Sequence, residues 1–128
     1  MQNKIVIDAS AILALLKMEE GHEMVAEKLD NAIISSVNFS EVITVISRNG
    51  FGTADVIKAL KNTFLHIIEF DTEQAIIAAT IDKTTKKHGL SLGDRACLAL
   101  AKQKNLPVLT SDKMWKGLDL DVEIQLIR

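Results

Sequence analysis

Four acidic residues stand inside or at the edges of the apolar segments of this 128-residue chain. Two follow short apolar runs and two lie in helical stretches: Asp8 and Asp112, and then Glu41 and Asp94. Burying an unpaired carboxylate costs roughly several kcal/mol, so such groups are usually kept away from core-facing positions. Their positions therefore predict a shared acidic pocket. The usual reason to hold such a pocket together is a hard divalent cation.

The chemistry of such a pocket follows from its charge. Mg²⁺ and Mn²⁺ prefer oxygen ligands from a few carboxylates and waters. Two carboxylates 4 Å apart repel each other by about 4 kcal/mol at an effective dielectric of 20. Without a cation, some of them take up protons. With a cation they stay ionised, and a bound water becomes acidic enough to act as a nucleophile. This arrangement suits hydrolysis of a phosphodiester.

Strands and helices alternate along the predicted chain. Apolar runs predict five strands, at 4–8, 32–35, 65–70, 107–110 and 122–127. Helical periodicity predicts six helices, at 11–17, 23–30, 36–48, 54–63, 72–87 and 94–104. Such alternation is typical of a parallel sheet with both faces covered. We therefore predict a single α/β domain over residues 1–128, with a parallel five-stranded sheet sandwiched between helices.

Polar residues before three of these helices are predicted to cap them. Ser10 and Thr53 precede the helices at 11–17 and 54–63. Asp71 has the form of the first residue of a capping box, with Gln74 at the third helical position. The segment 90–93 is predicted to be a loop that ends where Asp94 opens the last helix.

The sheet is expected to bring the acidic residues together. Ligands of such sheets bind beyond the carboxyl ends of the strands, where the strand order reverses. Asp8 and Asp112 both come just after a predicted strand. If the strands 4–8 and 107–110 are neighbours, these two carboxylates meet at that edge. Glu41 and Asp94 are expected in the first turns of helices that begin near the same edge.

Each acid also has a plain structural interpretation. Asp8 could bind loop amides at a strand end, and Asp112 could belong to a turn. Glu41 could face solvent on the helix face that it shares with Asn38. Asp94 could be an ordinary acid at a helix N-terminus, paired with the arginine that follows it. The conjunction of all four at one sheet edge favours the pocket.

Charge and composition narrow the partners. The net charge is −2 and the pI is near 5.9, which argues against a general nucleic-acid binder. Nucleic acid would have to contact local basic clusters, although such clusters are also typical of a solvated helix face. Two clusters stand near the acids: Lys83, Lys86, Lys87 and His88, and then Lys113 and Lys116.

A single cysteine, Cys97, excludes an internal disulfide and a cysteine-rich zinc site. It is predicted to be a small core residue in a protein of the reducing cytoplasm. The apolar run that reaches Leu16 resembles a signal peptide, but Asp8 interrupts it and no cleavage site follows. Trp115 is predicted to anchor the last loop in the core.

Four segments resemble the PIN-domain ribonucleases, and within them the VapC-type toxins of toxin–antitoxin pairs. The matching segments occur in family order along the whole chain: 7–11, Glu41, 90–101 and 109–115. The resemblance implies an acidic quartet that binds Mg²⁺ or Mn²⁺: Asp8, Glu41, Asp94 and Asp112. It also implies that Ser10 and Ser111 form supporting hydrogen bonds within that site.

The same resemblance implies partners. Members of the family cleave RNA, often a transfer RNA or a ribosomal RNA, commonly form homodimers, and are neutralised by a cognate antitoxin protein. We predict that the phosphates of RNA contact Arg95, Lys86, Lys87 and Lys113. The first four helices carry more apolar residues than a small domain needs, so we expect an exposed groove between them that takes an amphipathic antitoxin helix.

Three other functions are alternatives to a ribonuclease toxin. An aspartyl-phosphate phosphatase needs a second aspartate two residues after the first, where this chain has Ser10. A receiver domain needs an acidic pair after its first strand and a lysine after its fifth, and the chain has neither. The remaining alternative is a catalytically inactive PIN module that binds RNA or protein. Four mutually repelling acids argue against a retired site.

Overall fold

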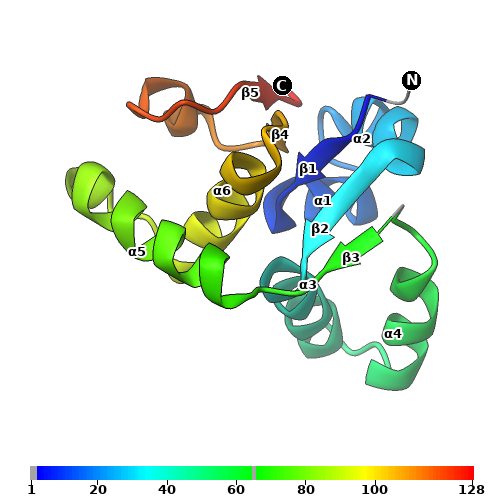
Figure 1. Ribbon diagram of the computed structural model, residues 1–128. Coiled ribbons are helices and arrows are strands. Elements are labelled where there is room, and N and C mark those ends of the chain that lie inside the picture. The colour runs from blue at the N-terminus through cyan, green and yellow to red at the C-terminus, as the bar shows by residue number, and fades with distance from the viewer. Residues whose placement is uncertain (1–2, 65) are drawn as a thin grey trace.

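The computed structural model describes residues 3–64 and 66–128, and within them five parallel strands form one sheet in the order β3-β2-β1-β4-β5 (Figure 1). The strands are short and central: β1 (Ile5–Ile7), β2 (Ala32–Ser35), β3 (His66–Ile68), β4 (Val108–Thr110) and β5 (Ile124–Leu126). The prediction of an α/β domain with a five-stranded parallel sheet is confirmed.

Helices cover both faces of this sheet (Figure 1). One face carries α1 (Ala9–Leu16), α2 (His22–Lys28), α3 (Ser36–Arg48) and α4 (Thr53–Lys61). The other carries α5 (Thr72–Thr85) and α6 (Leu92–Lys104). Three short 3₁₀ turns complete the chain: η1 (Leu29–Asn31), η2 (Lys86–His88) and η3 (Lys113–Gly117). Among the described residues, no helix has the length and apolar character needed to cross a bilayer.

Alternate residues of the strands supply two separate cores. Ile5 and Ile7 of β1 face α1 to α4, whereas Val6 faces α5 and α6. This follows from the two-residue period of a strand. Trp115 of η3 is 1% exposed and packs in the core of the second face, as predicted, and Cys97 is fully buried there. Packing on both faces holds β1 and β4 in place, and so fixes the positions of the acids that follow these strands.

The strand order reverses between β1 and β4, which are direct neighbours. Val6 pairs with Val108, and Ile7 pairs with Leu109. The chain therefore leaves both strands at one edge, where Asp8 and Ser111 follow. The predicted pocket required the strands that precede Asp8 and Asp112 to be neighbours, and they are.

Three predicted helix starts are wrong. Helix α1 begins at Ala9 and is capped by Asp8, whose side chain accepts from the Ala11 N–H, so Ser10 is not the cap. Helix α4 begins at Thr53 itself, with Gly52 as its N-cap. Helix α6 begins at Leu92 inside the predicted loop, because Ser91 caps it with its hydroxyl.

Other boundaries differ by a few residues. Asp71 caps α5 as predicted, accepting from the Gln74 N–H at 2.8 Å. The predicted capping box is not completed, because the Gln74 side chain donates to the Glu69 carbonyl and to Gln103 and its oxygen has no donor among the described residues. The α-helix ends at Thr85 rather than residue 87, and a 3₁₀ turn continues to Gly89, whose φ of 63° ends the segment. A φ in this range suits glycine, which has no Cβ. The start of the predicted third strand, Leu65, lies outside the described residues.

Candidate active site

Asp8 is the most enclosed of the four predicted acids, with only 5% of its surface exposed. It lies between the end of β1 and the start of α1, so its position is set by the core strand and by its capping role. Three neighbours donate to its carboxylate: the Thr110 hydroxyl at 2.6 Å, the Ser10 hydroxyl at 2.8 Å and the Ala11 N–H at 2.9 Å. Asp8 is therefore both buried and held in one orientation.

Burial raises the pKa of Asp8 from its ordinary value of 3.8 to about 6. The three hydrogen bonds lower this pKa, and the negative charge of Asp94 raises it further. Among the residues that the structure describes, no lysine or arginine forms an ion pair with Asp8. The carboxylate has thus lost water without gaining a positive neighbour, and a cation would stabilise its charged form.

The end of β4 completes this side of the site through hydrogen bonds. The Ser111 N–H donates to the Ser10 hydroxyl at 3.1 Å, and the Asp112 N–H donates to the Thr110 hydroxyl at 3.1 Å. The carboxylate of Asp112 itself caps η3, accepting from the Met114 N–H at 3.0 Å. The backbone of Asp112 is therefore linked to Asp8 through the Thr110 hydroxyl. Its side chain caps a turn, which is the plain structural interpretation given for it above.

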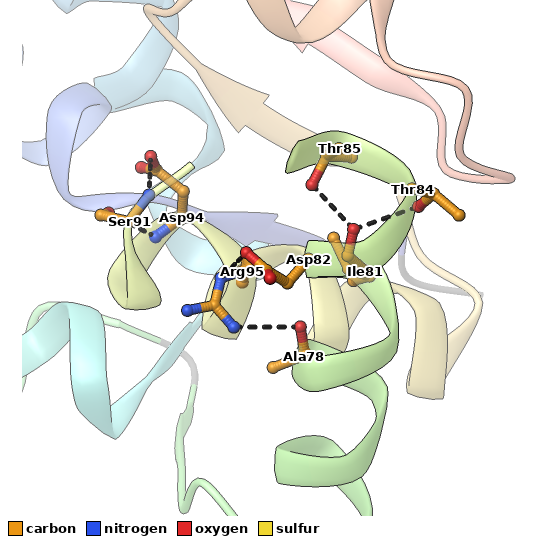
Figure 2. Close-up of polar contacts among 8 residues, drawn as sticks. All are labelled: Ala78, Ile81, Asp82, Thr84, Thr85, Ser91, Asp94 and Arg95. Atoms are coloured by element: carbon orange, nitrogen blue, oxygen red, sulfur yellow. Dashed lines mark hydrogen bonds and ion pairs between the residues drawn. The ribbon is translucent and has the colours of Figure 1, made fainter. Parts of the chain in front are cut away.

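Asp94 lies in the first turn of α6, where it forms a capping box with Ser91 (Figure 2). The Ser91 N–H donates to the Asp94 carboxylate at 3.0 Å, and the Asp94 N–H donates to the Ser91 hydroxyl at 3.1 Å. Both bonds are exposed to water. Little free energy is then needed to release this carboxylate toward a ligand, since water replaces the lost bond.

Glu41 lies in the second turn of α3, not in the first turn as expected. It accepts a hydrogen bond from the Asn38 amide at 2.8 Å, and its carboxyl group rests against the backbone of Gly93 in α6. The two helices α3 and α6 therefore meet at this carboxylate.

Three of the four acids lie near enough to Cys97 of α6 to act on its thiol. Burial raises the pKa of the Cys97 thiol well above its usual range, and three nearby carboxylates add to the rise. These are Asp8, Asp94 and Glu41. Over residues 3–64 and 66–128, however, no three acidic, histidine or cysteine side chains stand close enough to share one ion. Each carboxylate is instead turned toward its own protein donor.

The donor set fits a hard divalent cation. All four acids and the neighbouring hydroxyls offer oxygen, which Mg²⁺ and Mn²⁺ prefer. Burial is the main cause of the raised pKa of Asp8, the negative charge of Asp94 adds to it, and a bound cation would oppose both effects. The residues that would hold the ion are Asp8, Asp94, Glu41 and Asp112.

A family profile described as the PIN domain matches residues 5–120. The chain belongs to the PIN domain family. The match contains all four acids of the site. No curated protein sequence matches the chain.

Solved structures share the fold of this PIN domain over nearly its whole length. A toxin–antitoxin complex from Klebsiella pneumoniae is 20% identical with a TM-score of 0.79, and the match covers 98% of each chain. DNA-bound VapBC from Salmonella typhimurium is 17% identical with a TM-score of 0.74, covering 99% of this chain and 100% of that one. VapC20 from Mycobacterium tuberculosis, described as a toxin that cleaves the sarcin–ricin loop, is 16% identical with a TM-score of 0.75, covering 94% and 99%.

The four basic residues predicted to contact RNA differ in exposure and partners. Lys86 and Lys87 of η2 and Lys113 of η3 are exposed. Arg95 instead turns toward α5, where its guanidinium donates to the Ala78 carbonyl at 3.2 Å and lies 3.8 Å from Asp82 (Figure 2). Arg95 therefore pairs with Asp82 rather than with Asp94, and part of its donor capacity is already used.

Sequence reasoning missed three residues that shape the site. Thr110 donates the shortest hydrogen bond to Asp8, Asn38 holds Glu41, and Gly93 lets Glu41 approach α6. Asn38 had one readable signal, since it stands three residues before Glu41 and so shares a helix face with it. The other two depend on contacts between distant segments.

Proposed function

We propose that this PIN domain is a metal-dependent endoribonuclease that hydrolyses RNA phosphodiester bonds and acts as the toxin of a type II toxin–antitoxin pair. The observation that carries the proposal is the buried Asp8 carboxylate at the strand-order reversal, whose pKa is raised to about 6. No lysine or arginine among the described residues forms an ion pair with it. The toxin–antitoxin proteins among the structures of like fold support the biological role.

The chain's own residues have distinct roles in this proposal. Asp8, Asp94, Glu41 and Asp112 hold Mg²⁺ or Mn²⁺, and the hydroxyls of Ser10 and Thr110 keep Asp8 in place. When bound, such an ion lowers the pKa of water and offsets the charge of the phosphate.

The RNA is proposed to lie along exposed basic residues that stand near Asp94 and Asp112 in the sequence. Lys86, Lys87 and Lys113 are free to reach phosphates, whereas Arg95 would first have to leave Asp82. The sarcin–ricin loop named for the Mycobacterium tuberculosis protein supports a structured RNA as the class of target. We further propose that the protein forms a homodimer. We also propose that it resides in the reducing cytoplasm, in keeping with the single buried thiol of Cys97.

The first prediction is that cleavage depends on a divalent ion. Purified protein should cut transfer RNA and ribosomal RNA in Mg²⁺ or Mn²⁺, lose the activity in excess EDTA and regain it when the ion is restored. Cleavage products are resolved on denaturing gels. A catalytically inactive module would bind these RNAs without cutting them, and cutting that persists in EDTA would exclude the metal from the mechanism.

The proposed antitoxin partner has a groove to occupy. A cavity of about 330 Å³ opens between α1, α3 and α4. Two large apolar side chains at this cavity are left in water, Phe51 at 64% exposure and Leu16 at 45%. Its walls are mostly apolar: Leu16, Ile46, Phe51, Gly52, Asp55, Val56, Ala59 and Leu60. An amphipathic helix that buries its apolar face here fits this lining.

The second prediction tests this groove. The C-terminal peptide of the protein encoded in the adjacent reading frame should slow hydrogen exchange in α1, α3 and α4, and should block RNA cleavage. Phe51→Glu should weaken binding by about 10-fold or more, because it places a charge in the apolar contact. Ile76→Glu is the matched control, since Ile76 is 63% exposed on α5. Protection confined to β5 and its neighbours would place the partner elsewhere.

A further inference from the structure

Asn38 is a buried polar residue whose two amide hydrogens are both used. It lies in the first turn of α3 and is 2% exposed. Its Nδ2 donates to the Glu41 carboxylate at 2.8 Å and to the Gly93 carbonyl at 3.0 Å. The reverse orientation of the amide would put its oxygen against two acceptor oxygens, so these contacts fix which way it points.

The oxygen of the same amide has no donor among the described residues. A buried polar atom without a partner destabilises the fold. An apolar side chain would fill this position without that penalty. The presence of asparagine is therefore better explained by what its nitrogen holds than by packing.

Gly93 is the second half of this arrangement. A Cβ on Gly93 would lie 2.6 Å from Cδ of Glu41 and would clash with both carboxylate oxygens. The absence of a side chain thus lets the Glu41 carboxylate rest directly on the first turn of α6. Asn38 then bridges the two parts by holding Glu41 with one N–H and the Gly93 carbonyl with the other.

The bridge fixes the glutamate relative to Asp94, which follows Gly93 in α6. A glutamate on a helix surface has several rotatable bonds, and ordering it on binding opposes binding. Here the hydrogen bond orders it beforehand. We propose that Asn38 is a positioning residue that orients the Glu41 carboxylate to bind the divalent ion, and that Gly93 leaves the space for this carboxylate. This inference rests on the proposed metal site.

The test measures binding of Mn²⁺ alone by titration calorimetry, without RNA. Asn38→Ala should weaken Mn²⁺ binding by about 10- to 100-fold, which is typical when a partner of a metal ligand is removed. Asn49→Ala is the matched control, because Asn49 also donates its amide to a carbonyl of α3, that of Val45, but at the far end of the helix. This control should bind Mn²⁺ as the unmodified protein does.

A double variant separates positioning from general destabilisation. If Asn38 acts through Glu41, then Asn38→Ala should cause no further loss once Glu41→Ala has been made. Losses that multiply in the double variant would overturn the inference. Unchanged Mn²⁺ binding in Asn38→Ala, alongside weaker binding in Glu41→Ala, would overturn it while leaving the proposed function intact. Unchanged binding in Glu41→Ala would overturn both.

Gly93→Ala provides the same test without removing any hydrogen-bonding group. The added methyl meets the far end of a flexible side chain, and alanine favours a helix, so this variant should fold. It should displace Glu41 and weaken Mn²⁺ binding by about 10-fold or more. If Asn38→Ala does not fold, this variant decides, and unweakened binding would overturn the inference.

Discussion

Replacing Asp8 with asparagine should reduce RNA cleavage by more than about 100-fold, beyond the loss typical of removing a partner of a metal ligand. Asparagine keeps the size of the side chain and is as good a helix cap as aspartate, so α1 should still form. What it removes is the negative charge that the ion needs. The measurement is the initial rate of cleavage of one RNA at fixed Mg²⁺ and pH.

The matched control for this variant is Asp71→Asn. Asp71 caps α5 as Asp8 caps α1, but it is exposed and stands outside the site. Its replacement should leave cleavage within about twofold of the unmodified rate, because asparagine caps a helix equally well. Full activity of Asp8→Asn beside an intact control would mean that the pocket does not carry the chemistry.

The same replacement should raise stability in metal-free buffer near neutral pH. The difference between a pKa of 3.8 and one of about 6 corresponds to roughly 3 kcal/mol by which the charged Asp8 side chain disfavours the folded state. Asparagine removes this charge but weakens the bond from Thr110, which loses an ionised acceptor. We expect a net gain of about 1–2 kcal/mol in the free energy of unfolding.

The sign of the pH dependence follows from the raised pKa. The folded state binds the Asp8 proton more tightly than the unfolded state does, so this group's penalty is complete well above pH 6. It falls as the pH drops and vanishes below 3.8. The stability difference between Asp8→Asn and the unmodified protein should therefore narrow by roughly 1 kcal/mol between pH 7.5 and pH 5.

Urea unfolding in EDTA at these two pH values measures the effect. A constant difference between Asp8→Asn and the unmodified protein would show that Asp8 is not protonated near pH 6.

The arrangement of the acids about the sheet was predictable because it depends on chain order and periodicity. Short apolar runs separated by helices are typical of a parallel sheet. A polar residue that directly follows a buried strand must then emerge at its carboxyl edge. On this basis the sequence assigns Asp8 and Asp112 to one edge, provided that β1 and β4 are neighbours. The structure shows that they are.

The details of the helix starts were misjudged because competing caps stood close together. Both Asp8 and Ser10 are good caps, and the earlier one prevails because β1 ends immediately before it. Ser91 and Asp94 have the spacing of a capping box, which could have placed the start of α6 from sequence. Gly93 falls in the predicted loop but belongs to α6, where its lack of a side chain leaves room for the Glu41 carboxylate.

Side-chain partners between distant segments could not be predicted. Nothing local to Arg95 indicates that it turns toward Asp82, and nothing local to Thr110 indicates that it donates to Asp8. Both contacts depend on which helices and strands pack together. They appear only once the α5–α6 and β1–β4 neighbours are known.

The most direct test of the account is anomalous diffraction at the manganese edge from crystals soaked in Mn²⁺. The proposed metal site predicts one strong peak at the carboxyl edge of β1 and β4, within coordination distance of Asp8 and Asp94. Asp8→Asn crystals treated in the same way should show no such peak. A peak confined to another part of the molecule, or one that persists unchanged in Asp8→Asn, would contradict it.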